Sequence, residues 1–428
     1  MAADFASLGL HEWLVRQCKE MGMSHPTEIQ INAIPPILQG RDCMGCAKTG
    51  SGKTAAFALP ILQKLSEDPY GIFALVLTPT RELAIQIAEQ FRALGKTIGF
   101  KDAVIIGGMD MVRQGLELSQ QPHVVIATPG RLASHLNDIP TFSLQKIQFL
   151  VLDEADRLLE KSFEADLQVI FEKVPAKRQT LLFSATLSDT MGELMSIAQN
   201  QPFCYEVKSD FSTVSELDQR YLLIPPQVKD CYLVHILQNL PESKSAIVFT
   251  QTCRSCQVIT NTLRKVELKA TSLHSMMSQR ERIASLAKFR TGISKFLIAT
   301  DVASRGLDIP LVELVINLNV PASAKDYIHR VGRTARAGRG GMSVTFMTQH
   351  DIQRIKAIEE HVNVTMSEFE TCEADALKLL KVVSVVKREM ELRLNDSGFG
   401  ERKRVNKQKM MDLQSGKRQK EKKRKKSN

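Results

Sequence analysis

The stretch "CAKTGSGKTAAF" (Cys46 to Phe57) has the pattern of a phosphate-binding loop, which joins a β-strand to an α-helix. Gly52, Lys53 and Thr54 fill the last three places of G-x-x-x-x-G-K-[ST], whereas Ala47 stands in place of the first glycine. We expect Lys53 to reach the β- and γ-phosphates of a nucleotide and Thr54 to ligate Mg²⁺. The alternative is a glycine-rich turn with a chance lysine, and the strand–loop–helix context favours the nucleotide site. Backbone N–H groups at the head of the helix bind phosphate. The residues expected around the phosphates are Ala47, Thr49, Gly50, Ser51, Gly52, Lys53 and Thr54.

Short apolar runs continue this α/β pattern along the chain. Runs such as "FALVLT", "HVVIAT" and "IQFLVLD" alternate with helical patterns from about residue 40 to 205. Continuous apolar strands separated by helices indicate a parallel sheet covered on both faces. The pattern breaks at "VKSDFSTVSELDQ" (Val207 to Gln219) and restarts with "SAIVFT", "KFLIAT" and "LVINLNV". The sequence therefore predicts an α/β fold with two doubly wound parallel-sheet domains in tandem.

The domain boundaries follow from these breaks. We predict an N-terminal domain over residues 1–206, a linker over 207–218, a second domain over 219–365, a helical extension over 366–397 and a basic tail over 398–428. Residues 401–428 hold 13 Lys and Arg against 3 Asp and Glu, while the rest of the chain holds 44 of each sign. The tail has too few large apolar residues to form a core, so we expect it to be disordered. A nucleic-acid groove in the body must use locally placed charge.

Several protein classes are disfavoured by the composition. The sequence has no apolar run of about 18 residues and no signal-peptide pattern at its N-terminus, so we expect an intracellular protein without a membrane span. Eight cysteines in so long a chain do not suggest a disulfide framework. The pairs Cys43/Cys46 and Cys253/Cys256 have zinc-site spacing, but roughly 200 residues separate them and each lies beside a strand. We interpret them as reduced structural cysteines.

A second half of the nucleotide site is predicted in "FLVLDEADRLL" (Phe149 to Leu159). Four apolar residues run directly into Asp153 and Glu154 at the end of a strand. Asp153 is placed to hold Mg²⁺ directly or through water, and Glu154 to orient and deprotonate the attacking water. The alternative is a helix N-terminus with acids that are favourable to its dipole. That alternative does not explain acids at a strand end about 100 residues after a phosphate loop.

The segment Asp153 to Asp156 spells "DEAD", and the chain resembles the DEAD-box family over about residues 5 to 350. The resemblance implies two RecA-like domains and an ATP-dependent RNA helicase, and Ala47 is typical of the loop in this family. "GMSHPTEIQ" (Gly22 to Gln30) resembles the Q motif, in which the glutamine reads adenine. The residues that this likeness assigns to the adenine side are Phe5, Thr27 and Gln30. Met23 departs from the family's usual Phe, which puts part of the adenine packing in doubt.

Further family motifs follow in order and imply RNA contacts. "PTRELA" (Pro79 to Ala84), Gly107-Gly108 and "TPGR" (Thr128 to Arg131) resemble the RNA motifs of the first domain. Residues in "IVF" and "QRER", and the segment "TDVASRGLD" (Thr300 to Asp308), resemble those of the second. These motifs contain almost no aromatic side chains, so binding should use sugar and phosphate, be salt-sensitive and be largely independent of sequence. The expected RNA-binding residues are Thr80, Arg81, Gly108, Thr128, Gly130, Arg131, Arg282 and Thr300.

The resemblance also assigns residues that link the two domains. In "HRVGRTARAGR" (His329 to Arg339), it implies that Arg333 and Arg336 approach the γ-phosphate, and it implies that Asp308 contacts the ribose. Catalytic roles are thus expected for Glu154, Lys53, Arg333 and Arg336. Coupling between the ATP and RNA sites is expected from Asp156, Ser184, Thr186 and His329. Hydrolysis would require domain closure, which makes ATP and RNA reciprocal effectors.

Three functional hypotheses follow. The leading one is an RNA-dependent ATPase with ATP and Mg²⁺ as cofactors, which unwinds short duplexes or remodels ribonucleoproteins. The second is an ATP-gated RNA clamp or scaffold with little unwinding, and the third is a DNA helicase. The tail "KRQKEKKRKKSN" (Lys417 to Asn428) resembles a nuclear or nucleolar localisation signal, although a solvated tail without a specific role is the alternative. With the basic tail and compact size, the likeness favours a monomer of the ribosome-biogenesis branch, acting on pre-ribosomal RNA in the nucleolus.

Overall fold

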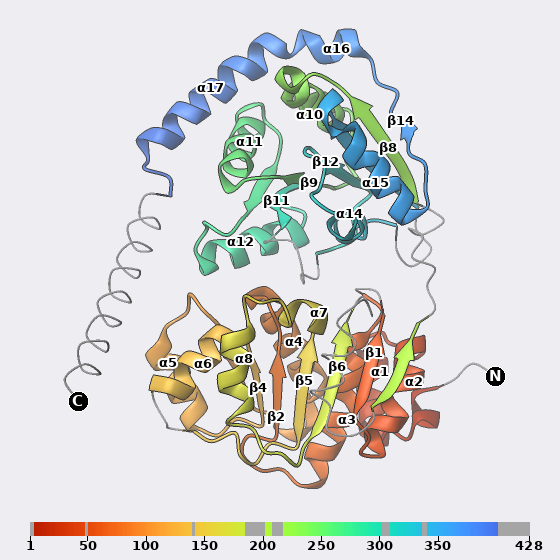
Figure 1. Ribbon diagram of the computed structural model, residues 1–428, viewed down its shortest axis with the longest axis vertical. Helices are drawn as coiled ribbons and strands as arrows, with labels where there is room; N and C mark the ends of the chain where they lie inside the picture. Colours follow the sequence, from red (N-terminus) through yellow and green to blue (C-terminus); the bar gives the residue numbers. More distant parts are fainter. Residues whose placement is uncertain are drawn as a thin grey trace, which may run out of the picture. The chain divides into compact units, whose positions relative to one another are not determined.

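The structure is a computed structural model that describes residues 4–47, 50–138, 142–184, 202–207, 217–301, 309–335 and 340–400. The chain divides into two units, Met1–Asp210 with Gly306–Asp308, and Phe211–Arg305 with Ile309–Asn428. Each unit contains one parallel sheet with helices packed on it (Figure 1). The boundaries predicted for the linker, the helical extension and the tail stay predictions. Most of the predicted linker and the tail from residue 401 lie outside the described residues.

The first unit is built on a sheet whose described strands are all parallel. Short runs of Val, Ile, Leu and Phe form its central strands, and these strands are buried along their whole length because helices cover both faces. In spatial order the strands are β3 (Asp102–Ile105), β4 (Val124–Ala127), β2 (Ala74–Leu77), β5 (Phe149–Asp153), β6 (Gln179–Ser184), β1 (Cys43–Cys46) and β7 (Phe203–Glu206).

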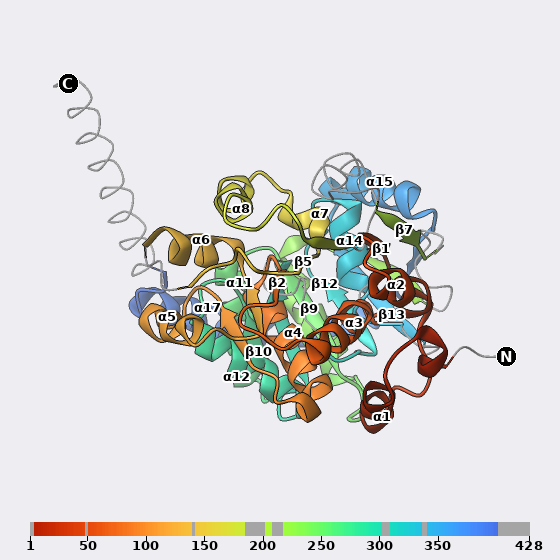
Figure 2. The same ribbon diagram turned by 90° about the horizontal axis from the view of Figure 1, so that it is seen from below.

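The helices of the first unit form two layers, one on each face of this sheet. The helical elements are η1 (Phe5–Leu8), α1 (Glu12–Glu20), α2 (Glu28–Leu38), α3 (Lys53–Glu67), α4 (Arg81–Leu94), η2 (Lys96–Ile98), α5 (Met111–Ser119), α6 (Pro129–Asp138), α7 (Ala155–Leu158) and α8 (Glu164–Phe171). Figure 2 shows α3 and α4 on one side of the sheet and α6 and α8 on the other. Phe57 and Phe91 lie in the first core layer, and Leu132 and Ile170 lie in the second.

The second unit repeats this architecture. Its strands, again all parallel, are in spatial order β10 (Ala270–Leu273), β11 (Phe296–Thr300), β9 (Ala246–Thr250), β12 (Leu314–Asn317), β13 (Gly341–Met347), β8 (Leu217–Leu223) and β14 (Ser367–Glu368). Its helical elements are η3 (Pro226–Val228), α10 (Lys229–Gln238), α11 (Cys253–Lys265), α12 (Gln279–Arg290), α14 (Ala324–Val331), η4 (Gln349–Asp351), α15 (Ile352–Val362), α16 (Glu373–Lys378) and α17 (Leu380–Asp396). The predicted α/β class with two doubly wound parallel sheets is confirmed.

Helix α17 lies along the outside of the second unit, against α11 (Figure 1). Val383 and Leu394 are buried on its inner face, and Lys387 forms an ion pair with Asp230 of α10 at 2.5 Å. After the helix, the Phe399 ring meets the His274 ring edge to face at 5.8 Å between centroids. The extension is thereby part of the second unit's packing.

The structure also bears on the expected class of protein. None of the helices in the described ranges combines the length and apolar character needed to cross a bilayer. All eight cysteines are free. Cys43, Cys46 and Cys256 are buried, and burial raises the pKa of the Cys46 thiol to about 11. A buried thiol with a raised pKa is unreactive, which agrees with a structural role for these cysteines.

Candidate active site

The carboxyl ends of the first sheet's strands gather the residues that the sequence predicted. Asp153 ends β5, Ser184 ends β6, and the phosphate-binding loop follows β1. On the other half of the same edge, Thr80 follows β2 and Thr128 follows β4. In open parallel sheets, ligands bind beyond the carboxyl ends of the strands. The predicted nucleotide residues occupy one half of this edge, and the predicted RNA residues occupy the other.

The phosphate-binding loop has the backbone that its glycines predict. Gly50 and Gly52 have φ angles of 83° and 90°, a region that residues with a Cβ rarely adopt. Gly52 is the N-cap of α3, so the loop leads directly into the helix N-terminus. The Ser51 hydroxyl is buried and makes no hydrogen bond to any residue in the described ranges. An unsatisfied buried hydroxyl at a helix N-terminus fits a loop that completes its hydrogen bonds with a bound phosphate.

Lys53 begins α3 and is 9% exposed. Its Nζ donates a hydrogen bond to the Ala47 carbonyl across the loop. Burial lowers the pKa of Lys53, and the nearby carboxylates of Asp153 and Glu154 oppose that shift. A buried ammonium with only part of its charge compensated favours an anionic ligand. Thr54, the predicted Mg²⁺ ligand, is the next residue of the helix and is half-buried.

Asp153 and Glu154 are placed by the end of β5. Asp153 is 4% exposed, and its Oδ1 accepts a hydrogen bond from the Glu154 backbone N–H at 3.0 Å. Glu154 has φ 52° and ψ 50°, the left-handed conformation, which is uncommon for a side chain of this size. Burial, followed by the charge of Asp153, raises the pKa of Glu154 to about 7, and Arg157 opposes the shift from 4.0 Å. A strained backbone and a carboxyl group that titrates near neutrality are features of a general base.

The predicted Q-motif residues lie against the phosphate-binding loop. The Gln30 side-chain amide donates to the Gly52 carbonyl at 3.1 Å, and its Oε1 accepts from the Thr27 backbone N–H at 2.9 Å. Thr27 and Gln30 form a capping box at the start of α2. A Cβ on Gly52 would collide with the Gln30 amide. Phe5, in contrast, is 1% exposed and belongs to the core beneath this region.

The predicted RNA residues of the first unit also lie close to one another. The Thr80 hydroxyl caps α4 by accepting from the Leu83 N–H at 3.4 Å. A Cβ on Gly107 would lie 2.7 Å from the Arg81 guanidinium, so a side chain at this position would push the end of this arginine aside. Burial lowers the pKa of Arg81, and the neighbouring Arg131 lowers it further, although Glu82 opposes both. Two arginines that repel one another at a strand end favour an anion such as a phosphate.

Two further glycines complete this half of the site. Gly108 follows β3 and has φ 83°, a backbone conformation that a residue with a Cβ adopts only at a cost. Gly130 lies in the first turn of α6, where a Cβ would meet the Asp166 carboxylate at 3.0 Å. Both positions keep the backbone accessible at the carboxyl edge of the sheet.

Ser184 and Asp156 lie at the nucleotide half of the first sheet. The Ser184 carbonyl accepts a hydrogen bond from the Ala47 N–H at 3.1 Å, which ties the end of β6 to the entry of the phosphate-binding loop. Asp156 lies in α7, and its charge opposes the lowering of the pKa of Lys53. The structure thus places Asp156 and Ser184, two of the four predicted coupling residues, at the nucleotide half of this sheet edge.

The predicted residues of the second unit extend from the carboxyl edge of its own sheet, where β11 ends, to Arg333, whose carbonyl accepts from the Val312 N–H ahead of β12. Thr300 ends β11, and its buried hydroxyl makes no hydrogen bond within the part of the chain that the structure describes. Arg282 lies on α12 and is 9% exposed. His329 lies on α14, and Arg333 follows that helix and is 3% exposed. Four predicted site residues lie outside the described residues: Thr49, Thr186, Asp308 and Arg336.

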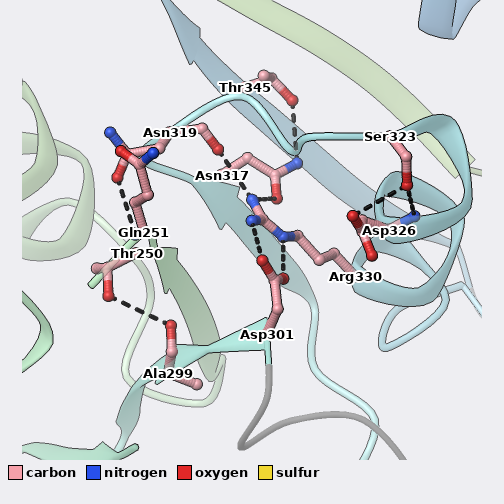
Figure 3. A network of polar contacts seen from close by, with 10 residues as sticks. All are labelled: Thr250, Gln251, Ala299, Asp301, Asn317, Asn319, Ser323, Asp326, Arg330 and Thr345. Carbon is pink, nitrogen blue, oxygen red and sulfur yellow. Dashed lines mark hydrogen bonds and ion pairs between the residues drawn. The ribbon is translucent and has the colours of Figure 1, made fainter. Parts of the chain in front are cut away.

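Sequence reasoning missed two charged residues in this unit, Arg330 and Asp301. Figure 3 shows the Arg330 guanidinium facing the Asp301 carboxylate, with Asn317 and Asn319 on its other side. Both residues lie within stretches that the motifs already marked, "TDVASRGLD" and "HRVGRTARAGR". The motif spacing gave no sign that the two stretches meet.

Comparison with known proteins identifies the family to which these motifs belong. The family model described as DEAD/DEAH box helicase matches residues 27–194, and the one described as helicase conserved C-terminal domain matches residues 228–338. The human protein named probable ATP-dependent RNA helicase DDX49 is 60% identical over 418 residues, which cover 96% of this chain and 86% of the human one. The chain belongs to the DEAD-box family of ATP-dependent RNA helicases.

Other DEAD-box proteins agree with this assignment. The fission-yeast (Schizosaccharomyces pombe) ATP-dependent RNA helicase dbp8 is 51% identical over 421 residues, which cover 95% of this chain and 93% of that protein. Among solved structures, S. cerevisiae Dbp5 bound to RNA and ADP BeF3 has a TM-score of 0.78 at 28% identity, covering 90% of this chain and all of the Dbp5 chain. The DEAD-box helicase Mss116 bound to ssRNA and UDP-BeF has a TM-score of 0.80 at 29% identity, covering 94% and 89%. The predicted family, fold and enzyme class are confirmed.

Proposed function

We propose that this DEAD-box protein hydrolyses ATP in an RNA-dependent manner and uses the cycle to open short RNA duplexes or to remodel ribonucleoproteins. One observation carries the proposal. The buried Lys53, Asp153 and Glu154 lie on one half of a sheet edge whose other half presents Arg81 and Arg131. A nucleotide site and a phosphate-binding surface therefore share one rigid element, which suits a protein that couples the two ligands.

The residues of the first unit have distinct proposed roles in hydrolysis. Lys53 and the loop N–H groups hold the phosphates, and Gln30 and Thr27 support the loop from the adenine side. Glu154 accepts the proton of the attacking water, because its pKa of about 7 leaves a large ionised fraction at neutral pH. The Thr54 hydroxyl and the Asp153 carboxylate are oxygen donors of the kind that Mg²⁺ prefers, and bound Mg²⁺ would neutralise phosphate charge there.

The second unit is proposed to supply Arg333 and Arg336 to the transferring phosphoryl group. Arginines in this role are worth about 10³–10⁵ in rate. Hydrolysis then depends on closure of the two units, and a ligand that binds both units favours closure. Asp308 at the ribose, and Thr186 and His329 as coupling residues, belong to the same proposal through their family motifs.

RNA is proposed to bind through its sugar-phosphate backbone. The support is the set of residues placed along the two sheet edges, in which arginine, threonine and glycine predominate, and the RNA present in the Dbp5 and Mss116 structures. Non-specific backbone contacts by cationic side chains release counterions, so affinity should fall as salt rises. Stacking of bases on aromatic side chains has little part in this proposal.

The finer proposal concerns the pathway. We infer that the protein is a monomer in the nucleolus and processes pre-ribosomal RNA with ribonucleoprotein partners. The support is the likeness to DDX49 and dbp8 together with the 13 Lys and Arg of residues 401–428. A dense basic cluster of this kind serves as a nuclear localisation signal or an RNA-binding tail.

The central test compares ATP hydrolysis without nucleic acid, with single-stranded RNA and with DNA of the same sequence. We expect strong stimulation by RNA and weak stimulation by DNA, and equal stimulation would contradict the RNA assignment. Strand separation of a short RNA duplex is measured in parallel with RNA release under ATP. Slow release without strand separation would favour the clamp over the helicase.

The pathway is tested by crosslinking the protein to RNA in cells and sequencing the bound fragments. Enrichment of pre-ribosomal RNA is the expected result. Dispersed messenger RNA fragments would contradict the ribosome-biogenesis assignment without affecting the proposed RNA-dependent ATPase.

A further inference from the structure

Arg330 is a buried charged side chain with several hydrogen-bond partners at the second unit's sheet edge. It is 4% exposed and forms a two-pronged ion pair with Asp301, with Nε–Oδ1 at 2.5 Å and Nη2–Oδ2 at 2.7 Å. Its Nη1 donates to the Asn317 side-chain oxygen at 3.2 Å and to the Asn319 carbonyl at 2.8 Å. Figure 3 shows these partners around three sides of the guanidinium.

The partners of Arg330 are themselves held in place. The Asn317 side-chain amide donates to the Thr345 hydroxyl on β13 at 3.1 Å, which fixes the oxygen that faces Arg330. The Asn319 side chain accepts from the Gln251 backbone N–H at 3.2 Å, which ties the end of β12 to the end of β9. The Arg330 guanidinium also lies 5.2 Å from the centre of the Phe249 ring. The site is thus built for a planar, five-donor cation.

This cluster joins two stretches that have different proposed ligands. Asp301 directly follows Thr300, a proposed RNA contact. Arg330 lies one helical turn before Arg333, a proposed phosphate contact, and the Arg333 N–H donates to the Arg330 carbonyl at 3.2 Å. The Arg333 carbonyl in turn accepts from the Val312 N–H at 3.2 Å. A shift of the Thr300–Asp301 backbone would therefore move the turn that carries Arg333.

We propose that the Arg330–Asp301 pair is a positioning device that couples the RNA contact at Thr300 to the phosphate contact at Arg333. The proposal rests on the RNA-dependent ATPase function stated above. Arg330 acts through Arg333 and does not itself touch a ligand. When RNA binds at the end of β11, the two-pronged Arg330–Asp301 ion pair (the fork) transmits the position of that strand end to the end of α14.

Energetics favour positioning over stability as the purpose of this pair. A buried ion pair is often no more stabilising than well-packed apolar residues, because both charges must be removed from water. What the pair supplies is geometry, since two parallel N–H···O bonds fix the orientation of both groups as well as their separation. Lysine keeps the charge but cannot form the fork, so R330K separates charge from geometry.

The test measures the ratio of ATP hydrolysis at saturating RNA to hydrolysis without RNA, in the full chain. The variants are R330K, D301N and the double variant, with D218N as the matched control. Asp218 also forms a two-pronged pair with an arginine of the same unit, Arg220, but that pair is about one-third exposed and lies on β8. We expect the ratio to fall about tenfold in R330K and D301N, within the usual range of coupling between two sites. The ratio should stay at the wild-type value in D218N.

The double variant distinguishes a pair from two independent residues. If the fork is the coupling element, R330K with D301N should lower the ratio no further than either single change. Additive losses would overturn the proposal. Thermal unfolding of each variant is recorded, and the ratio is compared only at temperatures where every variant is folded.

A purely structural role predicts a different result. In that case R330K and D301N would lower the unfolding temperature and scale both hydrolysis rates equally, which leaves the ratio unchanged and overturns the proposal. Failure of the broader function is distinguishable, because it would appear as no stimulation by RNA in the wild-type protein.

Discussion

The carboxyl edges of the two sheets hold their buried charges differently. In the first unit, Lys53, Asp153 and Glu154 share a buried site in which burial raises the pKa of Glu154 to about 7 and Glu154 adopts a left-handed backbone. In the second unit, Arg330 is paired with Asp301 at two points and has further acceptors. The first sheet thus has at its carboxyl edge a buried charge cluster with a strained backbone. The second sheet has at its carboxyl edge an arginine whose charge is paired and hydrogen-bonded.

This difference shows what each edge is built to do. A site that must bind phosphate and take up a proton needs groups whose partners are incomplete before the ligand arrives. A site that must hold one backbone segment against another needs every donor engaged, because a half-satisfied buried network is costly. We therefore expect substitutions in the first cluster to affect chemistry and substitutions in the second to affect stability and coupling.

The largest expected effect is on hydrolysis in Glu154→Gln. Loss of the base should lower kcat by about 10²–10⁴-fold. ATP binding should persist, and the unfolding temperature should not fall, because the repulsion between Glu154 and Asp153 is removed. Steady-state ATPase assays and thermal unfolding measure both. Glu160→Gln, at an exposed position nearby, is the control. An unchanged rate in Glu154→Gln would remove Glu154 from its assigned role.

The next effect is on stability in Arg330→Met. Removing Arg330 takes the two-pronged partner from Asp301, and breaking a buried pair in this way should cost the second unit about 3–5 kcal/mol. Arg220→Met removes an arginine that is about one-third exposed from a similar pair and should cost no more than about 1 kcal/mol. Urea unfolding monitored in both variants gives the two values. Equal losses of unfolding free energy in the two variants would contradict the expectation that burial sets the cost of breaking such a pair.

A smaller effect is expected on ATP affinity in Gly52→Ala. The left-handed backbone costs about 1–2 kcal/mol for a residue with a Cβ, and the new methyl group would also displace the Gln30 amide. Gly40→Ala is a matched control, because Gly40 has φ 82° but has nothing within 4 Å of an added Cβ. Both variants should lose stability, whereas only Gly52→Ala should bind ATP more weakly, by about tenfold for the lost hydrogen bond and altered loop. Nucleotide titration would contradict this if both variants bound ATP equally well.

The smallest effect is expected on RNA binding in Arg131→Ala. Removing one phosphate contact should weaken binding uniformly across RNA sequences and lower the slope of log affinity against log salt by about 1. Arg113→Ala changes an exposed arginine of α5 that is paired with Glu117, and should leave the slope unchanged. Binding isotherms at several salt concentrations measure the slopes. Equal slopes for Arg131→Ala and the wild type would place Arg131 outside the RNA contact.

Much of the nucleotide site could be predicted because its residues lie close together in sequence. The run from Gly50 to Thr54 is continuous, and Asp153 and Glu154 follow a single apolar strand, so motif and periodicity were enough. The left-handed backbone of Glu154 could not be predicted, because the sheet end and the start of α7 impose it. The burial of Phe5 in the core was likewise not visible in the motif that marked it.

The Arg330–Asp301 cluster shows where sequence reasoning ends. Its members are Asp301 directly after β11, Asn317 at the end of β12, Asn319 after β12 and Arg330 on α14, and the motif stretches give no register between them. Only parallel pairing of β9 with β11 and β12 brings Thr250, Asp301 and Asn317 to one edge. Hydrogen-bond partners that are 10 to 30 residues apart depend on that register.

The sequence by itself determined the family, the two α/β units and the residues that chemistry requires, because loops, strand-end acids and apolar periodicity are local patterns. Tertiary structure alone decided which charged groups have few hydrogen-bond and ion-pair partners and which have several. Burial and partner geometry set the pKa of Glu154 and the fork of Arg330, and both depend on segments that meet only when the parallel sheets form.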